Sequence, residues 1–382
     1  MRLLLINYEY PPIGGGAANA TEYLLREFSR LDREELRQGI QVELVTSSVG
    51  KHLKKEEIFP GIWYHGLPVG KRHLHFWRQS EVLRFLLRGY RYVKSLLAAK
   101  RFSLCHAFFG IPGGLIAYSV RSSVPYILSL RGSDVPGFNV RFRLIYPALA
   151  PILRPVWKEA RRVIANSQGL KELALKTNPT QPIQIIPNGV DTEEFHPAET
   201  PGRDGPIFLT VSRLIQRKGL DLVIRGFAQI APHLPKSKLI MVGEGNLREE
   251  LEELAFSLNL AGRTDFRGYV PHSEMPKVYR SADIFVLASR NEGMSNAILE
   301  AMASGLPIIT TATGGIKELI RDNGIVVPQE DVGTLVRAMG ELAGDKEKRV
   351  SLGKRSRERA QEFSWSRVAR AYIEIYQAES GK

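Results

Sequence analysis

The chain has 382 residues, of which 43% are hydrophobic and 24% charged, and this describes a soluble globular protein with room for two ordinary domains. Its single cysteine, Cys105, excludes an internal disulfide and favours a reducing, cytoplasmic location. No apolar run approaches the roughly 20 residues that span a bilayer, and residues 1–7 predict a first strand rather than a signal peptide.

The net charge of +13 is unevenly distributed along the chain. Residues 51–180 contain 22 Lys and Arg against 6 Asp and Glu, a net charge of +16, whereas the rest of the chain sums to −3. We expect such a basic region to attract anionic partners, which include lipid headgroups, nucleic acid and phosphorylated substrates.

The first elements alternate between strand and helix. A strand at residues 2–7 and a glycine-containing loop precede a helix from about Ala17 to Leu31, and a second strand covers residues 42–46. This alternation predicts a parallel sheet with helices on both faces. NAD binding is disfavoured, because Asn19 occupies the place of the third glycine of the dinucleotide fingerprint and the second strand does not end in an acid.

Residues 71–101 predict a basic amphipathic helix. Apolar residues recur at helical spacing from Phe76 to Leu97, and Arg and Lys occupy much of the rest. Such a helix could dock on an anionic membrane surface. Alternatively, its apolar stripe packs on the sheet and its charges are only solvated.

Two further strands of the first half end near polar residues. The predicted strand at residues 102–109 contains His106, and a lone strand histidine is more often a hydrogen-bonded core residue than a catalytic one. The strand at residues 126–130 is followed by Asp134, which could bind a substrate hydroxyl or cap the next helix.

A broken helical segment is predicted after these strands, because residues 140–158 contain three prolines. The later stretch up to Pro206 is rich in proline, glycine and charge, and it predicts an interdomain linker.

The second half opens with a strand at residues 207–212 that leads to Arg213 and, five residues later, Lys218. Cations at a strand-to-helix turn can bind a diphosphate, and they would stabilise the negative charge of a leaving diphosphate. Solvated loop cations are the alternative. A further strand at residues 239–243 leads to Glu244.

Residues 283–305 form the most informative stretch. A buried strand leads to a loop with Glu292, and a helix capped by Ser295 or Asn296 follows and ends in a glycine stop. The helix N-terminus attracts a phosphate, and Glu300 lies about 6 Å further along the helix. Carboxylates on both flanks of a diphosphate suit a nucleotide sugar. Alternatively, both glutamates are solvated surface residues.

The segment SRNEGMSNAILEAMASGLPIITTATGG resembles the donor-site signature of glycosyltransferase family 4, the retaining glycosyltransferases of the GT-B fold. The segments NYEYPPIGGGAANATEYL, IIPNGVDTEEFHP, VSRLIQRKGLDLVIRGF and MVGEGNLREELEELA also match, in the family's order, so that the resemblance covers nearly the whole chain. It implies an α/β fold of two Rossmann-like, doubly wound domains that face each other across a cleft. The donor would bind mainly to the second domain and the acceptor to the first.

The resemblance also implies domain limits. We expect a first, acceptor-side domain at residues 1–190, a linker at 191–206 and a nucleotide-sugar-binding domain at 207–362. The final helix, residues 363–382, would cross back onto the first domain.

Residue roles follow from the same resemblance. We expect Glu292 to hold the hydroxyls of the transferred sugar, Glu300 to hold the ribose, and the backbone near Val270 to contact the base. Many members carry a second histidine where this chain has Phe108. The expected donor-binding residues are Gly14, Gly15, Gly16, Arg213, Lys218, Glu244, Val270, Glu292, Gly293, Met294, Ser295, Asn296 and Glu300. The expected catalytic residues are Glu292, Arg213, Lys218, Asp134 and His106.

The expected reaction is retaining transfer of a sugar from a UDP- or GDP-sugar to a hydroxyl of a saccharide or lipid-linked acceptor, in cell-envelope polysaccharide or glycolipid synthesis. We expect no cofactor and no metal, because no cluster with ligand spacing appears. The expected location is cytoplasmic, with peripheral contact to the anionic inner face of the membrane. The alternatives are a GT-B-type phosphorylase and a non-catalytic GT-B binding protein. A nucleic-acid-binding protein is disfavoured, because no recognition motif is present.

Overall fold

The computed structural model describes residues 1–34, 39–74, 76–139, 146–198 and 205–380. The chain forms two compact units, one of residues 1–188 with 365–382 and one of residues 189–364. Phe195 of the predicted linker is buried in the core of the second unit, as is Val190 just before the linker. Residues 199–204 of that linker lie outside the described part, and the predicted domain limits stay predictions.

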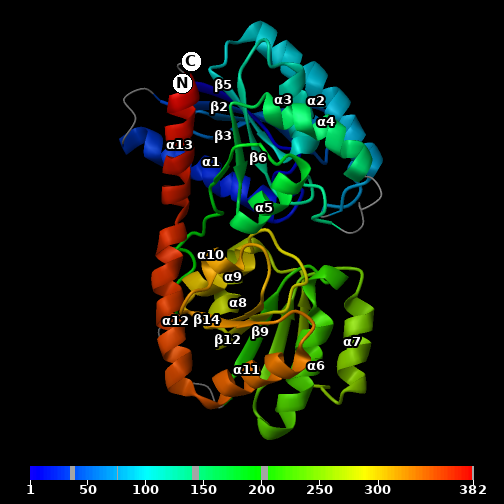
Figure 1. Ribbon diagram of the computed structural model, residues 1–382, viewed down its shortest axis with the longest axis vertical. Coiled ribbons are helices and arrows are strands. Elements are labelled where there is room, and N and C mark those ends of the chain that lie inside the picture. Colours follow the sequence, from blue (N-terminus) through cyan, green and yellow to red (C-terminus); the bar gives the residue numbers. More distant parts are fainter. Residues whose placement is uncertain (35–38, 75, 140–145, 199–204, 381–382) are drawn as a thin grey trace. The chain divides into compact units, whose positions relative to one another are not determined.

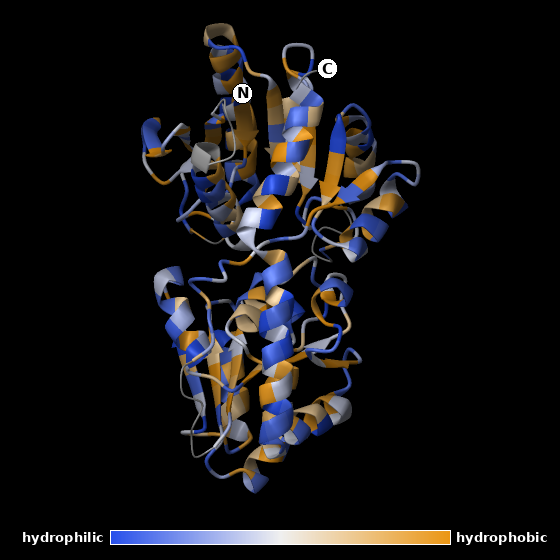
Figure 2. Cartoon of the chain, turned by 90° about the vertical axis from the view of Figure 1, so that its left-hand side faces the viewer, coloured by the Kyte–Doolittle hydropathy of each residue, from blue (hydrophilic) through white to orange (hydrophobic). Residues whose placement is uncertain are grey.

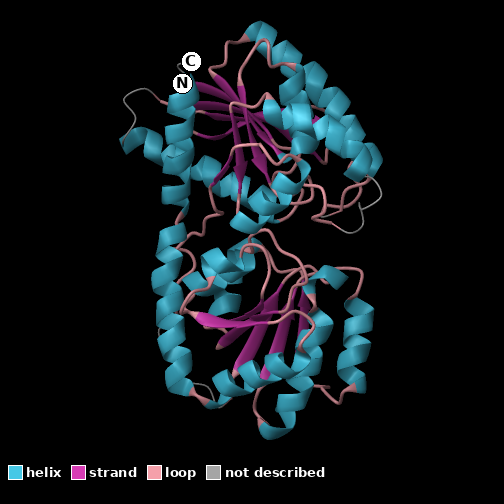
Figure 3. Ribbon diagram, in the orientation of Figure 1, coloured by secondary structure: helices cyan, strands magenta, loops and turns pink. Residues whose placement is uncertain are grey.

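In the first unit, the described residues form an eight-stranded sheet in the order β3-β4-β2-β1-β5-β6-β7-β8 (Figures 1 and 3). Its strands are β1 (Arg2–Ile6), β2 (Gln41–Ser48), β3 (Lys54–Phe59), β4 (Ile62–Pro68), β5 (Leu104–Phe108), β6 (Tyr126–Leu130), β7 (Arg162–Ala165) and β8 (Ile183–Ile185). Neighbouring strands pair in parallel except β3 and β4, which form an antiparallel hairpin at one edge. The predicted parallel α/β sheet is confirmed, and the hairpin is an addition that the sequence analysis missed.

The helices of the first unit come from both ends of the chain. They are α1 (Gly16–Glu34), α2 (Gln79–Ala99), α3 (Leu115–Ser119), α4 (Tyr146–Lys158), α5 (Gln168–Thr177) and α13 (Trp365–Ser380), with a π-helical turn η1 (Phe109–Gly114). The predicted amphipathic helix therefore begins only at Gln79, after a loop. Helix α4 is the described part of the predicted broken segment and contains Pro151 and Pro155, while residues 140–145 lie outside the described residues.

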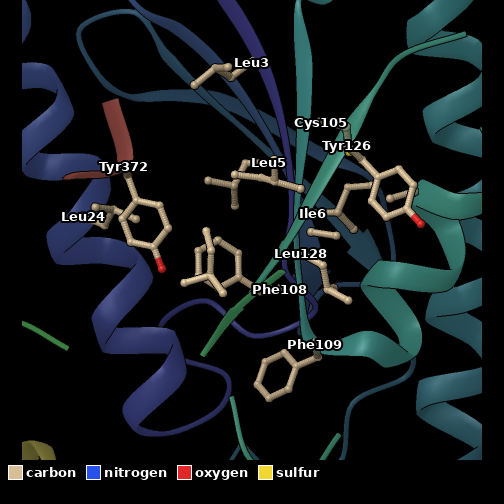
Figure 4. Close-up of a cluster of buried hydrophobic side chains, with 14 of the residues drawn as sticks. Leu3, Leu5, Ile6, Leu24, Cys105, Phe108, Phe109, Tyr126, Leu128 and Tyr372 are labelled. Atoms are coloured by element: carbon tan, nitrogen blue, oxygen red, sulfur yellow. The ribbon is translucent and has the colours of Figure 1, made fainter. Parts of the chain in front are cut away.

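The core of the first unit lies on both faces of its sheet, because Leu3 to Ile6 of β1 are each at most 1% exposed. Strands buried on both faces are typical of parallel sheets covered by helices. Leu24 of α1 and Tyr372 of α13 lie together on one side of β1 and β5 (Figure 4). The C-terminal helix is thus part of the first unit's core.

The described residues of the second unit form a six-stranded, fully parallel sheet in the order β11-β10-β9-β12-β13-β14. Its strands are β9 (Ile207–Val211), β10 (Lys238–Val242), β11 (Thr264–Gly268), β12 (Ile284–Leu287), β13 (Ile308–Thr311) and β14 (Gly324–Val327). Its helices are α6 (Leu220–Ile230), α7 (Arg248–Ser257), α8 (Met275–Arg280), α9 (Asn296–Ala303), α10 (Ile316–Leu319), α11 (Val332–Gly344) and α12 (Lys346–Ala360). Its short 3₁₀ turns are η3 (Gln216–Lys218), η4 (Ala231–His233), η5 (His272–Glu274) and η6 (Gln361–Phe363).

Strand β12 shows how the second unit builds two cores. Ile284 and Val286 pack with α6 and α11 on one face, whereas Phe285 and Leu287 pack with α8 and α9 on the other. This follows from the alternation of side chains along a strand. Figure 2 shows mostly hydrophobic strands inside each unit and many hydrophilic residues on the helices outside them.

Candidate functional site

Loops at the carboxyl edge of the second sheet are in direct backbone contact. A Cβ atom on Gly219, which follows η3, would lie 2.0 Å from the carbonyl oxygen of Ala288. A Cβ atom on Gly315, after β13, would lie 2.0 Å from the carbonyl oxygen of Gly293. Only glycine allows these approaches. The loops after β9, β12 and β13 therefore converge at the edge where open α/β sheets bind ligands.

Lys218 and Glu292 form a buried ion pair at this edge, through Nζ and Oε1. Ser289 Oγ also donates to Glu292 Oε1, at 2.8 Å. Burial alone would raise the pKa of Glu292, but the charges of Lys218 and Arg217 outweigh it and the pKa is lowered. Burial lowers the pKa of Lys218, and Glu292 opposes this change. Glu292 is therefore an ionised carboxylate that can accept hydrogen bonds from sugar hydroxyls.

Glu300 projects from α9 toward η5 and α8. The helix is capped by Ser295, whose Oγ accepts the N–H of Ile298 at 3.4 Å, so the first of the two predicted caps is confirmed. Glu300 Oε2 accepts the hydroxyl of Tyr279 at 2.7 Å, and Oε1 lies 3.3 Å from His272 Nε2. Burial and the charge of Glu300 raise the pKa of Tyr279, so it stays a donor. Glu300 is therefore a mostly buried carboxylate with two hydrogen-bond partners, rather than a solvated surface residue.

Other expected donor-binding residues of the second unit follow the carboxyl ends of strands in the same sheet. Arg213 is exposed, and no described residue pairs with its guanidinium. Glu244 Oε1 accepts the N–H of Tyr269 at 3.1 Å and pairs with Arg248 at 3.2 Å. Val270 is half-buried against the core. Gly293, Met294 and Ser295 are buried in the loop that leads into α9, which Asn296 opens.

The sequence analysis missed Arg290, which joins the loops of this site. Its guanidinium binds both carboxylate oxygens of Asp221, each at 3.1 Å, and both of Glu330, at 2.5 and 3.2 Å. It also donates to the carbonyl of Gln216 at 2.6 Å. The hydrogen bonds from Glu330 and Asp221 raise the pKa of Arg290 further. This side chain thus braces the Lys218 turn against the Glu292 loop, and no local pattern would have revealed it.

Gly14, Gly15 and Gly16 belong to the first unit, where they follow β1. Gly14 has a φ of 107° and donates its N–H to the carbonyl of Leu74 at 2.9 Å. Gly15 has open space where a side chain would be, and Gly16 begins α1. Their expected contact with a donor diphosphate stays a prediction.

Asp134 anchors loops of the first unit. Its carboxylate accepts three backbone N–H groups, from Gly110 at 2.8 Å, Arg131 at 3.0 Å and Gly132 at 2.9 Å. Burial raises its pKa, against the lowering effect of these hydrogen bonds. Both oxygens are thus engaged in holding backbone. The contacts favour a structural role, and a direct catalytic role stays a prediction.

His106 is fully buried in β5. Its Nδ1 lies 2.7 Å from the hydroxyl of Tyr376 on α13, and its Nε2 lies 2.8 Å from Ser129 Oγ on β6. Burial, helped by the nearby charge of Arg131, lowers its pKa well below the ordinary value, so the ring is neutral. These contacts favour the core alternative, and a role in catalysis stays a prediction.

Helix α2 has two apolar faces with different surroundings. Phe85, Val93 and Leu96 are buried against the sheet, as the structural alternative requires. Leu83, at 55% exposed, and Leu87, at 52%, lie on the outer face. Arg91 and Lys94 are exposed further along the helix. Packing on the sheet thus leaves part of the predicted apolar stripe uncovered by described residues.

Within the described residues, no group of three or more His, Cys, Asp and Glu side chains could hold a metal ion. A search of the same residues finds no helix that is long and apolar enough to cross a membrane.

Two parallel-sheet α/β units, the second with a cationic and acidic cluster at its carboxyl edge, have the architecture of the GT-B glycosyltransferases. Residues 191–359 match the family described as Glycosyl transferases group 1, and residues 14–194 match Glycosyltransferase Family 4. The chain therefore belongs to the group 1, family 4 glycosyltransferases. The sequence motifs predicted this family.

Relatives and solved structures agree with this assignment. An uncharacterized glycosyltransferase of Methanocaldococcus jannaschii is 24% identical over 98% of each chain. A GDP-mannose-dependent phosphatidylinositol monomannoside mannosyltransferase of Mycolicibacterium smegmatis is 30% identical over 52% of this chain and 59% of its own length.

Among solved structures, sucrose-phosphate synthase from Thermosynechococcus elongatus has a TM-score of 0.83 at 22% identity, over 99% of this chain and 98% of its own. Anabaena HepE in complex with UDP-glucose has a TM-score of 0.75 at 16% identity, over 99% and 100% of the two chains. These likenesses show the fold.

Proposed function

We propose that this glycosyltransferase transfers a sugar from a UDP- or GDP-sugar to a hydroxyl of a saccharide or lipid-linked acceptor, with retention at the anomeric carbon and without a metal. Arg213 and Lys218 bind the diphosphate together with the N–H groups from Gly293 to Asn296. Glu292 holds the hydroxyls of the transferred sugar, and Glu300 holds the ribose.

The buried Lys218–Glu292 pair is the observation that carries this proposal. A charge pair with so little exposure is expensive to bury, and it seldom adds to stability. Here it lies beside the N-terminus of α9, where anions are stabilised. When a diphosphate binds, Lys218 can turn toward it and stabilise its growing charge, while Glu292 is released to accept sugar hydroxyls. The complex of HepE with UDP-glucose supports this class of donor.

Calorimetric titration with UDP, GDP and their sugars tests the donor. We expect one nucleotide family to bind, and Glu300→Gln to weaken its binding about tenfold, because a hydrogen bond between a ribose hydroxyl and a charged carboxylate is lost. Glu253→Gln, an exposed glutamate on α7, is the matched control and should bind normally. If no nucleotide binds the wild type, the proposed donor is wrong. Once the donor is known, proton NMR of the product reports the anomeric configuration.

The exposed face of α2 supports a lipid-linked acceptor in envelope polysaccharide or glycolipid synthesis. Apolar side chains flanked by cations are typical of helices that lie in the interface of anionic membranes. The name of the mannosyltransferase relative contains a lipid-linked saccharide, phosphatidylinositol monomannoside. We therefore place the protein in the cytoplasm, with Leu83 and Leu87 in contact with the membrane's inner face.

Sedimentation with vesicles that contain anionic lipid tests this contact at physiological salt. The double variant Leu83→Gln, Leu87→Gln should bind several-fold less without a lower melting temperature, because both side chains are exposed. The control, Phe256→Gln, changes an apolar residue of α7 that is 76% exposed. Equal sedimentation of all three proteins would contradict membrane contact through α2.

A further inference from the structure

Arg131 is held in one orientation at the carboxyl end of β6. Its guanidinium carbon lies 4.6 Å from the centre of the Phe108 ring, at the end of β5. Its Nη1 donates to Asn188 Oδ1 at 2.8 Å, and its backbone N–H donates to Asp134 Oδ1 at 3.0 Å. Because groups from several strand ends hold it, little side-chain entropy remains to be lost when it binds a partner.

No acid of the described residues balances the charge of Arg131. No carboxylate of the described residues lies within 4.0 Å of its guanidinium, although the side chain is half-buried. Among the described residues, its Nε is buried without an acceptor, and the hydrogen bond of its guanidinium is made by Nη1 rather than Nη2. By contrast, Arg290 binds two carboxylates. A planar, half-buried guanidinium with unused donors is suited to a phosphate or carboxylate.

A buried acceptor lies on the neighbouring strand end. Asn166 is 5% exposed, and its Oδ1 has no hydrogen-bond partner among the described residues. Leu130 of β6 pairs with Ala165 of β7, so Arg131 and Asn166 are the next residues along two adjacent strands. An unused donor beside an unused acceptor matches a ligand that has both an anionic group and a hydroxyl.

We propose that Arg131 and Asn166 form a binding site in the first unit for a hydroxylated anion, such as a sugar phosphate or a glycerol phosphate. Nη2 of Arg131 binds the phosphoryl oxygens, and Asn166 accepts a hydroxyl after a small rotation of its side chain. The site lies at the carboxyl edge of the sheet, where α/β sheets bind ligands. The surrounding sequence, residues 51–180, has a net charge of +16, which favours an anion. Assigning this ligand to the acceptor substrate rests on the proposed function, whereas the binding itself does not.

Titration with glycerol 3-phosphate, with glycerol as the uncharged control, tests the site. In side-chain ¹⁵N NMR, the buried Nε–H of Arg131 should shift with glycerol 3-phosphate and not with glycerol, and Arg131→Lys assigns the signal. By calorimetry, Arg131→Gln should weaken binding about tenfold or more, because a charge-assisted bond is lost. Asn166→Ala should weaken it less. Arg161→Gln is the matched control, since it removes an exposed cation beside the amino end of β7.

The nucleotide identified as part of the donor is titrated into the same samples. The outcomes then distinguish a failure of this inference from a failure of the donor proposal. Normal nucleotide binding with no shift of the Arg131 signal by glycerol 3-phosphate would overturn the inference alone. If the nucleotide shifts the Arg131 signal and displaces glycerol 3-phosphate, Arg131 serves the donor diphosphate and the acceptor assignment is wrong. If glycerol 3-phosphate still binds to the nucleotide-saturated protein and Arg131→Gln abolishes that binding, the inference is supported.

Discussion

The two units place acidic side chains at the same kind of edge, yet they hold them in different ways. In the second unit, Glu292 is held by Lys218 and Ser289, and Glu300 is held by side chains of α8 and η5. In the first unit, the carboxylate of Asp134 is held by three backbone N–H groups.

This difference decides which acidic side chains can exchange their present partner for a ligand. A lysine can rotate away from its glutamate at the cost of a side-chain torsion. Backbone N–H groups cannot leave Asp134 without a change in the loop itself, and an unpaired buried N–H costs free energy. An acidic side chain that follows a strand therefore holds backbone N–H groups in the first unit and belongs to the candidate site in the second.

Lys218→Met tests this comparison with the largest expected effect. The turnover number for sugar transfer should fall about 100- to 1,000-fold, as when one preorganised group that stabilises developing charge is removed. The exposed Lys277, which pairs with Glu274, supplies the control Lys277→Met. Steady-state kinetics with the identified donor measure both variants. A loss of less than threefold in Lys218→Met would show that the Lys218–Glu292 pair only supports the fold.

Glu43→Gln tests a buried network of the first unit. Burial raises the pKa of Glu43, but hydrogen bonds from His65 and Lys100 outweigh it and hold the pKa at about 2, below the ordinary 4.5. A lowered folded-state pKa stabilises the protein above the unfolded pKa, and this stabilisation is lost as the pH falls from about 4.5 to about 2. Over that window, the wild type should lose up to about 3 kcal/mol more unfolding free energy than Glu43→Gln.

Urea unfolding of the two proteins at several pH values measures this difference. Glu253→Gln, which removes an exposed carboxylate, should follow the wild type. Parallel pH curves for Glu43→Gln and the wild type would contradict a stabilising role for the Glu43 network.

His106→Ala separates a core residue from a catalytic one. It leaves the buried hydroxyls of Tyr376 and Ser129 without their ring partner, so the unfolding free energy should fall by about 2 kcal/mol. Nucleotide affinity should not change, because the proposed donor-binding residues Lys218, Glu292 and Glu300 lie in the other unit. Denaturant unfolding and calorimetry measure the two quantities. Undiminished stability together with lost transfer activity would instead show that His106 acts in catalysis.

Arg290→Lys should have the smallest effect. Lysine keeps the charge but cannot bind both Asp221 and Glu330 through paired hydrogen bonds, so the Lys218 and Glu292 loops lose part of their brace. Nucleotide binding should weaken by about 1 kcal/mol, the cost of a lost hydrogen bond, and Arg290→Ala should weaken it more. Equal affinities of the three proteins in calorimetry would show that Arg290 only supports the fold.

Much of the fold and part of the site could be predicted because they depend on neighbouring residues. The apolar run before Glu292 predicted β12, and a polar residue before a short apolar helix predicted the Ser295 cap. Hydrophobic periodicity reports burial over a few residues, and capping involves residues three positions apart. The same local signals predicted the parallel alternation of strands and helices in both units.

The family, the α/β class and the loops that contain Lys218 and Glu292 could therefore be predicted from the sequence alone. Which polar residues already have hydrogen-bond partners depends on how distant segments pack. His106 finds Tyr376 at a separation of 270 residues, and Arg290 finds Asp221 at a separation of 69. Periodicity shows that such a side chain is buried, but it does not identify the distant group that forms its hydrogen bonds. That partner depends on how the elements pack.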